Sequence, residues 1–191
     1  MVGRPRQRLS LALLLVFGGT AAGIQFRRSF DGVLRVEGWS QAIVEASQQS
    51  GLGDPSLLAA LVYSESRGRA DALSSVGARG LCQLKPATAA EVAMRLEMDG
   101  PPFTPEQNLL LGATYLREMM QRWQGNLDLA LLAYRMGPTA VSKGVEKAGG
   151  EEAWLEQLRR RKPSPWEYRT KVLRYRRRFE ERGRLQARGE A

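Results

Sequence analysis

Glu65 is placed where a carboxyl group can work as an acid. It lies near the end of a helix that the sequence predicts from Pro55, and three apolar positions share its face at helical spacing. These positions are Leu58, Leu61 and Val62. A carboxyl group that closes such a stripe either ends in solvent, pairs with a cation such as Arg67 or Arg69, or lies in a pocket where burial raises its pKa. A raised pKa keeps the group protonated near neutral pH, as a general acid requires.

The rest of the composition narrows the possible chemistry. The 191 residues include no histidine and a single cysteine, Cys82. A histidine base, an intrachain disulfide and a thiolate zinc cluster are therefore excluded, and we expect neither a metal nor a cofactor. Acid–base catalysis must use Asp, Glu, Lys or Tyr. Asp71, six residues beyond Glu65, is the nearby candidate for a second carboxylate; we interpret it as structural, with a base role in hydrolysis as the alternative.

The elements that must position Glu65 are helical. Apolar spacing, proline starts and glycine stops predict one all-α domain over residues 39–182, with a loop over 67–84 and no strand. The expected helices span 39–50, 55–66, 86–94, 104–124, 127–136, 139–147, 151–160 and 166–182. The polar tail, residues 183–191, is expected to be disordered.

The N-terminus has the pattern of an export signal. Arg4, Arg6 and Arg8 precede an apolar run from Leu9 to Ile24, and small residues lie toward the end of this run. This run is about 24 Å long as a helix, slightly short for a membrane span. Residues 1–24 are therefore either a cleaved signal peptide or a retained anchor in the inner membrane, and we expect a linker over residues 25–38.

The charge balance indicates an anionic partner. The formal net charge is +9, which suits the acidic cell wall, anionic lipid or nucleic acid. Export to the periplasm or cell envelope argues against nucleic acid. A basic C-terminal helix is interpreted either as a solvated face or as a contact with an anionic membrane surface.

Several ordered motifs resemble those of one family. Around Glu65 they are Glu65-Ser66, Ser74, Gly77-Ala78, Gly80-Leu81, Gln83, Pro86 and Thr88-Ala89. Further along they are Asn108, Gly112, Tyr115-Leu116, Ala133-Tyr134, and Tyr168 with Lys171-Val172-Leu173. In order and offset, this set resembles the soluble-type (SLT-domain) lytic transglycosylases of the goose-type lysozyme superfamily, over about residues 40–178.

The resemblance implies a lysozyme-like helical domain and a reaction. Glu65 would be the single catalytic residue, acting first as acid and then as base, to cut the β-1,4 bond between MurNAc and GlcNAc in peptidoglycan glycan strands and leave 1,6-anhydromuramic ends. The substrate-binding residues that it implies are Ser74, Gly80, Leu81, Gln83, Tyr134 and Tyr168. Small exported members of the family often serve envelope-spanning machines, so such a machine is a possible partner.

Three positions depart from the family pattern: Cys82 and Lys85 replace methionines, and Arg135 replaces an asparagine. A cation at Lys85 or Arg135 near Glu65 would lower the pKa of that carboxyl and oppose the acid role, or would bind a carboxylate of the substrate. Two alternatives therefore stay open. One is a lysozyme-like hydrolase, and the other is a non-catalytic wall-binding scaffold.

Overall fold

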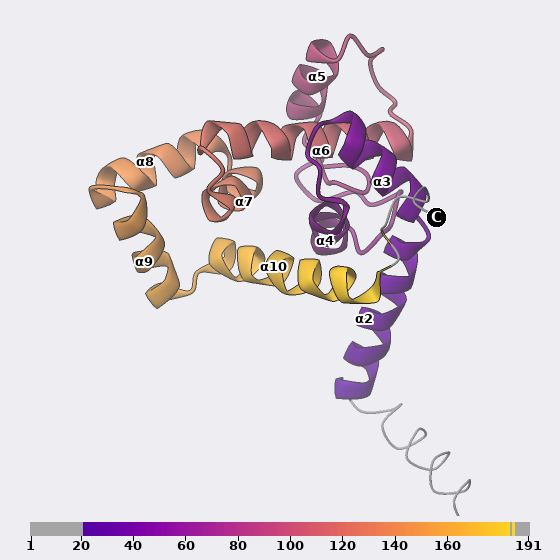
Figure 1. Ribbon diagram of the computed structural model, residues 1–191, viewed down its shortest axis with the longest axis horizontal. Coiled ribbons are helices and arrows are strands. Elements are labelled where there is room, and N and C mark those ends of the chain that lie inside the picture. The colour runs from indigo at the N-terminus through magenta and orange to yellow at the C-terminus, as the bar shows by residue number, and fades with distance from the viewer. Residues whose placement is uncertain (1–20, 184, 186–191) are drawn as a thin grey trace, which may run out of the picture.

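The computed structural model describes residues 21–183 and residue 185, and in this part of the chain it has nine helices and no named strand, which confirms the all-α prediction (Figure 1). The helices are α2 (Ala21–Glu37), α3 (Ser40–Gln49), α4 (Pro55–Glu65), α5 (Pro86–Arg95), α6 (Pro105–Arg122), α7 (Leu127–Met136), α8 (Pro138–Ala148), α9 (Glu151–Arg161) and α10 (Ser164–Arg182). Every predicted helix is present, with ends that differ by at most two residues.

Helix α4, which ends at Glu65, lies in the centre of the molecule. It begins as the sequence predicts: Asp54 Oδ1 accepts a hydrogen bond of 2.8 Å from the N–H of Leu57, and Pro55 occupies the first turn. Its residues from Leu57 to Tyr63 are all buried, so this helix is enclosed on every side. Its most extensive neighbour is α10, and α3 and α2 also pack on it.

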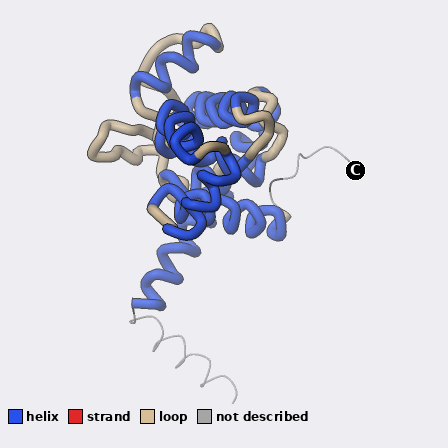
Figure 2. The backbone as a smooth tube through the Cα atoms, turned by 90° about the vertical axis from the view of Figure 1, so that its left-hand side faces the viewer, coloured by secondary structure: helices blue, strands red, loops and turns tan. Residues whose placement is uncertain are grey.

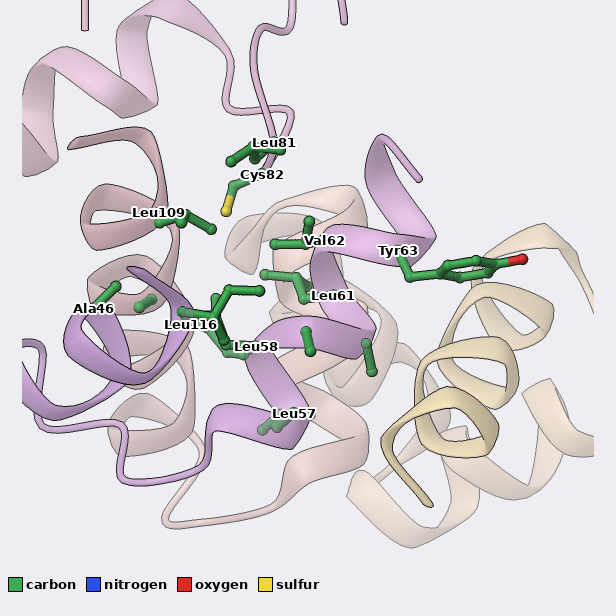
Figure 3. Close-up of a cluster of buried hydrophobic side chains, with 14 of the residues drawn as sticks. Ala46, Leu57, Leu58, Leu61, Val62, Tyr63, Leu81, Cys82, Leu109 and Leu116 are labelled. Carbon is green, nitrogen blue, oxygen red and sulfur yellow. The ribbon is translucent and has the colours of Figure 1, made fainter. Parts of the chain in front are cut away.

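Two apolar clusters hold the other helices around α4. Figure 3 shows the first, in which Leu58 and Leu61 of α4 meet Leu109 and Leu116 of α6, while Tyr63 points away toward α10. The second cluster joins α6 to α7, α8 and α9 and includes the buried Trp154. Figure 1 shows the result: α6 and α10 run on opposite sides of α4, and α8 and α9 connect that pair at one end.

The expected linker at residues 25–38 is instead helical up to Glu37, so that prediction was wrong (Figure 2). Val33 and Val36 of α2 are fully buried, and α2 packs on α4. The indole N–H of Trp39, just after α2, donates a hydrogen bond of 3.2 Å to the carbonyl of Gly68. The sequence did not reveal this helix because its apolar stripe is narrow and its partners are remote in the chain.

Leu185 corrects the expected disorder of the tail. Its side chain is buried and belongs to the first apolar cluster, whereas residues 184 and 186–191 lie outside the described residues. The predicted signal or anchor run also falls mostly outside them, at residues 1–20. Among the described residues, no helix has both the length and the hydropathy that crossing a bilayer requires.

Candidate active site

Glu65, the last residue of α4, lines a cavity of about 560 Å³. The other residues that line it are Asp31, Arg35, Ser64, Ser66, Arg67, Arg69 and Lys171. Burial raises the pKa of the Glu65 carboxyl above its usual 4.5, while the Tyr168 hydroxyl and the charges of Arg135 and Lys171 act in the opposite direction. Burial is the largest of these effects, so the net shift has the direction that a general acid needs.

Tyr168 and Arg135 lie on the α7–α10 side of the carboxyl group. The Tyr168 hydroxyl is buried and has no hydrogen-bond partner of standard geometry among the described residues, yet it lies close enough to Glu65 to lower the pKa of that carboxyl. Arg135 Cζ is 5.5 Å from the centroid of the Tyr168 ring. A hydrogen bond from Tyr168 to this carboxyl group would strengthen when Glu65 ionises.

Tyr134 holds the loop that faces Glu65. Its hydroxyl donates a hydrogen bond of 2.9 Å to the carbonyl of Cys82, and its ring packs at a tilt on Tyr115 with centroids 5.2 Å apart. Burial, and the nearby Cys82 and Glu65, raise the pKa of the Tyr134 phenol well above its usual value. Tyr134 thus lies close enough to Glu65 to interact with it electrostatically, as the resemblance implied. Its hydroxyl proton is already donated to the Cys82 carbonyl.

Asn108 of α6 holds the same loop from the other side. Its Oδ1 accepts a hydrogen bond of 2.8 Å from the N–H of Cys82, and its Nδ2 donates one of 3.3 Å to the carbonyl of Arg79. Gly80 lies between these two bonds with a φ of +78°, and a Cβ there would lie 2.6–2.7 Å from the Asn108 carboxamide. Only glycine allows this approach. The sequence matched Asn108 to the family's long helix but gave it no role.

Ser74 and Gln83 both use their side chains inside the loop. Ser74 Oγ accepts a hydrogen bond of 3.0 Å from the N–H of Ala78. Gln83 Nε2 donates to the carbonyls of Ala72 and Gly80, at 2.9 and 3.0 Å. These bonds shape the loop, and substrate contacts by either residue stay a prediction.

Leu81 was predicted to approach the substrate through its backbone, and that contact stays a prediction. Its side chain is fully buried in the apolar cluster around α4 (Figure 3). A sugar can reach only the backbone of this residue.

The remaining charged candidates differ in whether they lie close enough to affect Glu65. Lys85 is exposed and is not among the groups that shift the pKa of Glu65, whereas Arg135 is. Asp71 is exposed and lines a different cavity, beside Phe103.

The sequence analysis gave no role to Lys171. Its ammonium donates a hydrogen bond of 3.1 Å to the carbonyl of Ser64, the residue before Glu65. Across the described residues, no group of three or more Cys, Asp and Glu side chains gathers as metal ligands would.

Comparison with known proteins gives one consistent family. The profile of the transglycosylase SLT domain matches residues 41–157. The transglycosylase of Enterobacteria phage PRD1 is 41% identical over 108 residues, which are 56% of this chain and 38% of the phage protein. The membrane-bound lytic murein transglycosylase F of Cellvibrio japonicus is 34% identical over 134 residues, 65% of this chain and 26% of that protein.

A solved structure agrees with these matches. An inactive mutant of the lytic transglycosylase Slt from Pseudomonas aeruginosa superposes with a TM-score of 0.65 at 28% identity, over 76% of this chain and 24% of that one. This chain therefore spans between a quarter and two fifths of the length of these relatives. Glu65 and the loop from Ser74 to Gln83 lie inside the matched range.

Proposed function

Because this chain belongs to the transglycosylase SLT domain family, we propose that it is a lytic transglycosylase of peptidoglycan, which cuts the β-1,4 bond between MurNAc and GlcNAc and leaves 1,6-anhydromuramic ends. The observation that carries the proposal is the Glu65 carboxyl, which lines an open cavity inside the matched range and has a raised pKa because it is buried.

One carboxyl group is sufficient for this reaction. Protonated Glu65 gives its proton to the glycosidic oxygen as the bond from C1 of MurNAc to that oxygen breaks. The resulting Glu65 carboxylate then accepts the proton of the muramoyl 6-hydroxyl, while the oxygen of that hydroxyl bonds to C1. Glu65 ends protonated, and no water is consumed.

The neighbours of Glu65 suit an acid that must ionise during the reaction. Arg135 and Lys171 both favour the carboxylate electrostatically, and the Tyr168 hydroxyl can donate to it. Burial favours the protonated form of the resting group, and these three groups stabilise the charge that forms when the proton leaves.

The decisive test is Glu65→Gln, with mass spectrometry of the soluble products from purified peptidoglycan. The amide cannot transfer a proton, so we expect product release to fall by about 10²–10⁴-fold. The matched control is Glu146→Gln, an exposed glutamate on α8, which should digest the wall at the wild-type rate.

The fold of the variant can be checked with a signed expectation. The pKa of Glu65 is raised in the folded state, so its stabilising effect is present below the unfolded pKa and is lost as pH rises through the folded one. Glu65→Gln should therefore be at least as stable as the wild type at pH 8 in thermal unfolding.

Three outcomes would overturn the proposal. Undiminished digestion by Glu65→Gln removes Glu65 from the chemistry. Reducing ends without anhydro ends would make the protein a lysozyme-like hydrolase, and a wild type that releases no product would make it a wall-binding scaffold.

We also propose that the protein works in the cell envelope, exported or anchored through its N-terminal apolar run. The relatives named as membrane-bound lytic murein transglycosylases support the location.

The basic face of α10 is smaller than its sequence implies, because Arg169, Arg176 and Arg182 pair with Asp128, Asp54 and Glu37. Attraction to an anionic membrane through the exposed Arg174 and Arg177, and service to an envelope-spanning machine, stay predictions.

A further inference from the structure

The cavity that reaches Glu65 is lined mainly by cations. Arg35, Arg67, Arg69 and Lys171 line it, against the carboxyl groups of Asp31 and Glu65. None of these four cations forms an ion pair with a described residue, in contrast to Arg169, Arg176 and Arg182 on α10. Uncompensated like charges in one cavity repel one another, so an anion that enters it is attracted.

Local structure holds these cations in place. Arg67 adopts a left-handed φ of +56°, and its carbonyl accepts a hydrogen bond of 3.1 Å from Arg35 Nε. Gly68 follows with a φ of +75°, where a Cβ would lie 2.8 Å from the N of Val36 in α2. The chain after Glu65 is thus in close contact with α2, and Arg35 of α2 lines the cavity.

Helix α2 lies outside the region that the family profile matches, which begins at residue 41. Arg35 and Asp31 therefore reach the surroundings of Glu65 from outside the range of that profile. Lys171 supplies a supporting observation, because burial and the neighbouring Arg67 lower the pKa of its ammonium. A bound anion would relieve that repulsion.

We propose that Arg35, Arg67, Arg69 and Lys171 form a carboxylate-binding subsite beside Glu65, which holds a peptide carboxylate of the glycan substrate. This inference rests on the proposed function, because that function is what brings a peptide-bearing strand to the cavity. The subsite would make the enzyme prefer strands whose peptides carry free carboxylates over stripped or amidated strands. Asp31 lines the same cavity with a negative charge and limits this preference.

The direct test is a binding measurement on the Glu65→Gln protein, which prevents turnover. Two muramoyl dipeptides serve as probes: one carries a free α-carboxylate on its second residue, and the other carries the amide at that position. Isothermal titration at low salt should show the acid binding roughly fivefold more tightly than the amide, since an exposed charge contact is worth less than a factor of ten. The difference should shrink at 0.5 M salt.

Variants of opposite sign separate charge from structure. Arg35→Gln removes both the charge and a contact to the Arg67 carbonyl, so Arg69→Gln, on the loop, provides a second loss of charge without touching α2. Both should reduce the preference for the acid. Asp31→Asn should increase it, which a purely structural effect would not do. The matched control is Arg177→Gln, an exposed arginine on α10 that does not line the cavity.

The outcomes are distinguishable from those of the proposed function. Equal binding of acid and amide by the Glu65→Gln protein overturns the subsite, whatever products the wild type releases. Binding of phosphatidylglycerol vesicles that depends on Arg35, with no preference between the dipeptides, would also overturn it and assign the cations to a lipid surface. A preference that disappears in Arg69→Gln and grows in Asp31→Asn supports it, even if the products prove to be reducing ends.

Discussion

Replacing Asn108 with alanine should destabilise the protein through the loop that holds Arg79 and Cys82. The Asn108 side chain is buried between α6 and the loop, and it satisfies the N–H of Cys82 and the carbonyl of Arg79. Cys82 is fully buried, so water cannot replace the lost acceptor without a rearrangement of the loop. Asn108→Ala therefore leaves a buried donor without a partner.

The size of the effect follows from these two bonds. An unsatisfied buried N–H costs about 1–3 kcal/mol, and the loss of the longer second bond adds about 0.5–1.5 kcal/mol. We expect the free energy of unfolding to fall by about 2–4 kcal/mol, which leaves a typical domain folded. For a chain of this size, the melting temperature should fall by about 5–15 °C.

Urea unfolding followed by tryptophan fluorescence measures this change, and the denaturant slope should stay constant. The matched control is Thr114→Val on the same helix. Thr114 Oγ1 is buried with no hydrogen-bond partner among the described residues, so its removal should cost nothing or stabilise the fold. A loss below about 0.5 kcal/mol for Asn108→Ala, or an equal loss in both variants, would refute the reasoning.

Other predictions concern titration and access. Because burial raises the pKa of Glu65, wall digestion should decline with rising pH at a midpoint above 4.5; a midpoint at or below 4.5 would contradict the assigned acid. Arg135 lowers that pKa, so Arg135→Gln should move the midpoint to higher pH, and an unchanged profile would remove Arg135 from the site. Cys82 is fully buried, and burial raises the pKa of its thiol far above the usual value; a disulfide reagent at pH 8 should label it at least about 100-fold faster in the unfolded protein, and rapid labelling of the native protein would show that the loop opens.

The sequence predicted α4 and the position of Glu65 because both depend on local signals. Asp54 and Pro55 start the helix, and the apolar positions up to Glu65 repeat at its period. The order of motifs then indicated the family, which the profile match confirms. What the sequence could not show is that Ser74 and Gln83 direct their side chains into the loop, since the partners of those side chains are backbone atoms brought close only by folding.

Helix α2 was not predicted from the sequence, for a different physical reason. Among the α2 side chains that the structure describes, Val33 and Val36 are the buried apolar ones, and this is too weak a periodic signal to distinguish the helix from a linker. Its stability comes from contacts with α4, with the turn at Gly68 and with Arg182, all distant in sequence. Elements stabilised in this way are predicted poorly because tertiary packing, rather than propensity, decides them.

The same point changes what the net charge of +9 means for function. Counted along the sequence, the cations of α10 form one basic surface. In the folded chain, three of its arginines form ion pairs with Asp54 before α4, Glu37 at the end of α2 and Asp128 in the first turn of α7. These arginines therefore connect helices. Four cations that form no ion pair among the described residues instead line the cavity of Glu65, and one of them, Lys171, lies on α10 itself. Under the proposed function, these cations would attract an anionic strand directly toward Glu65.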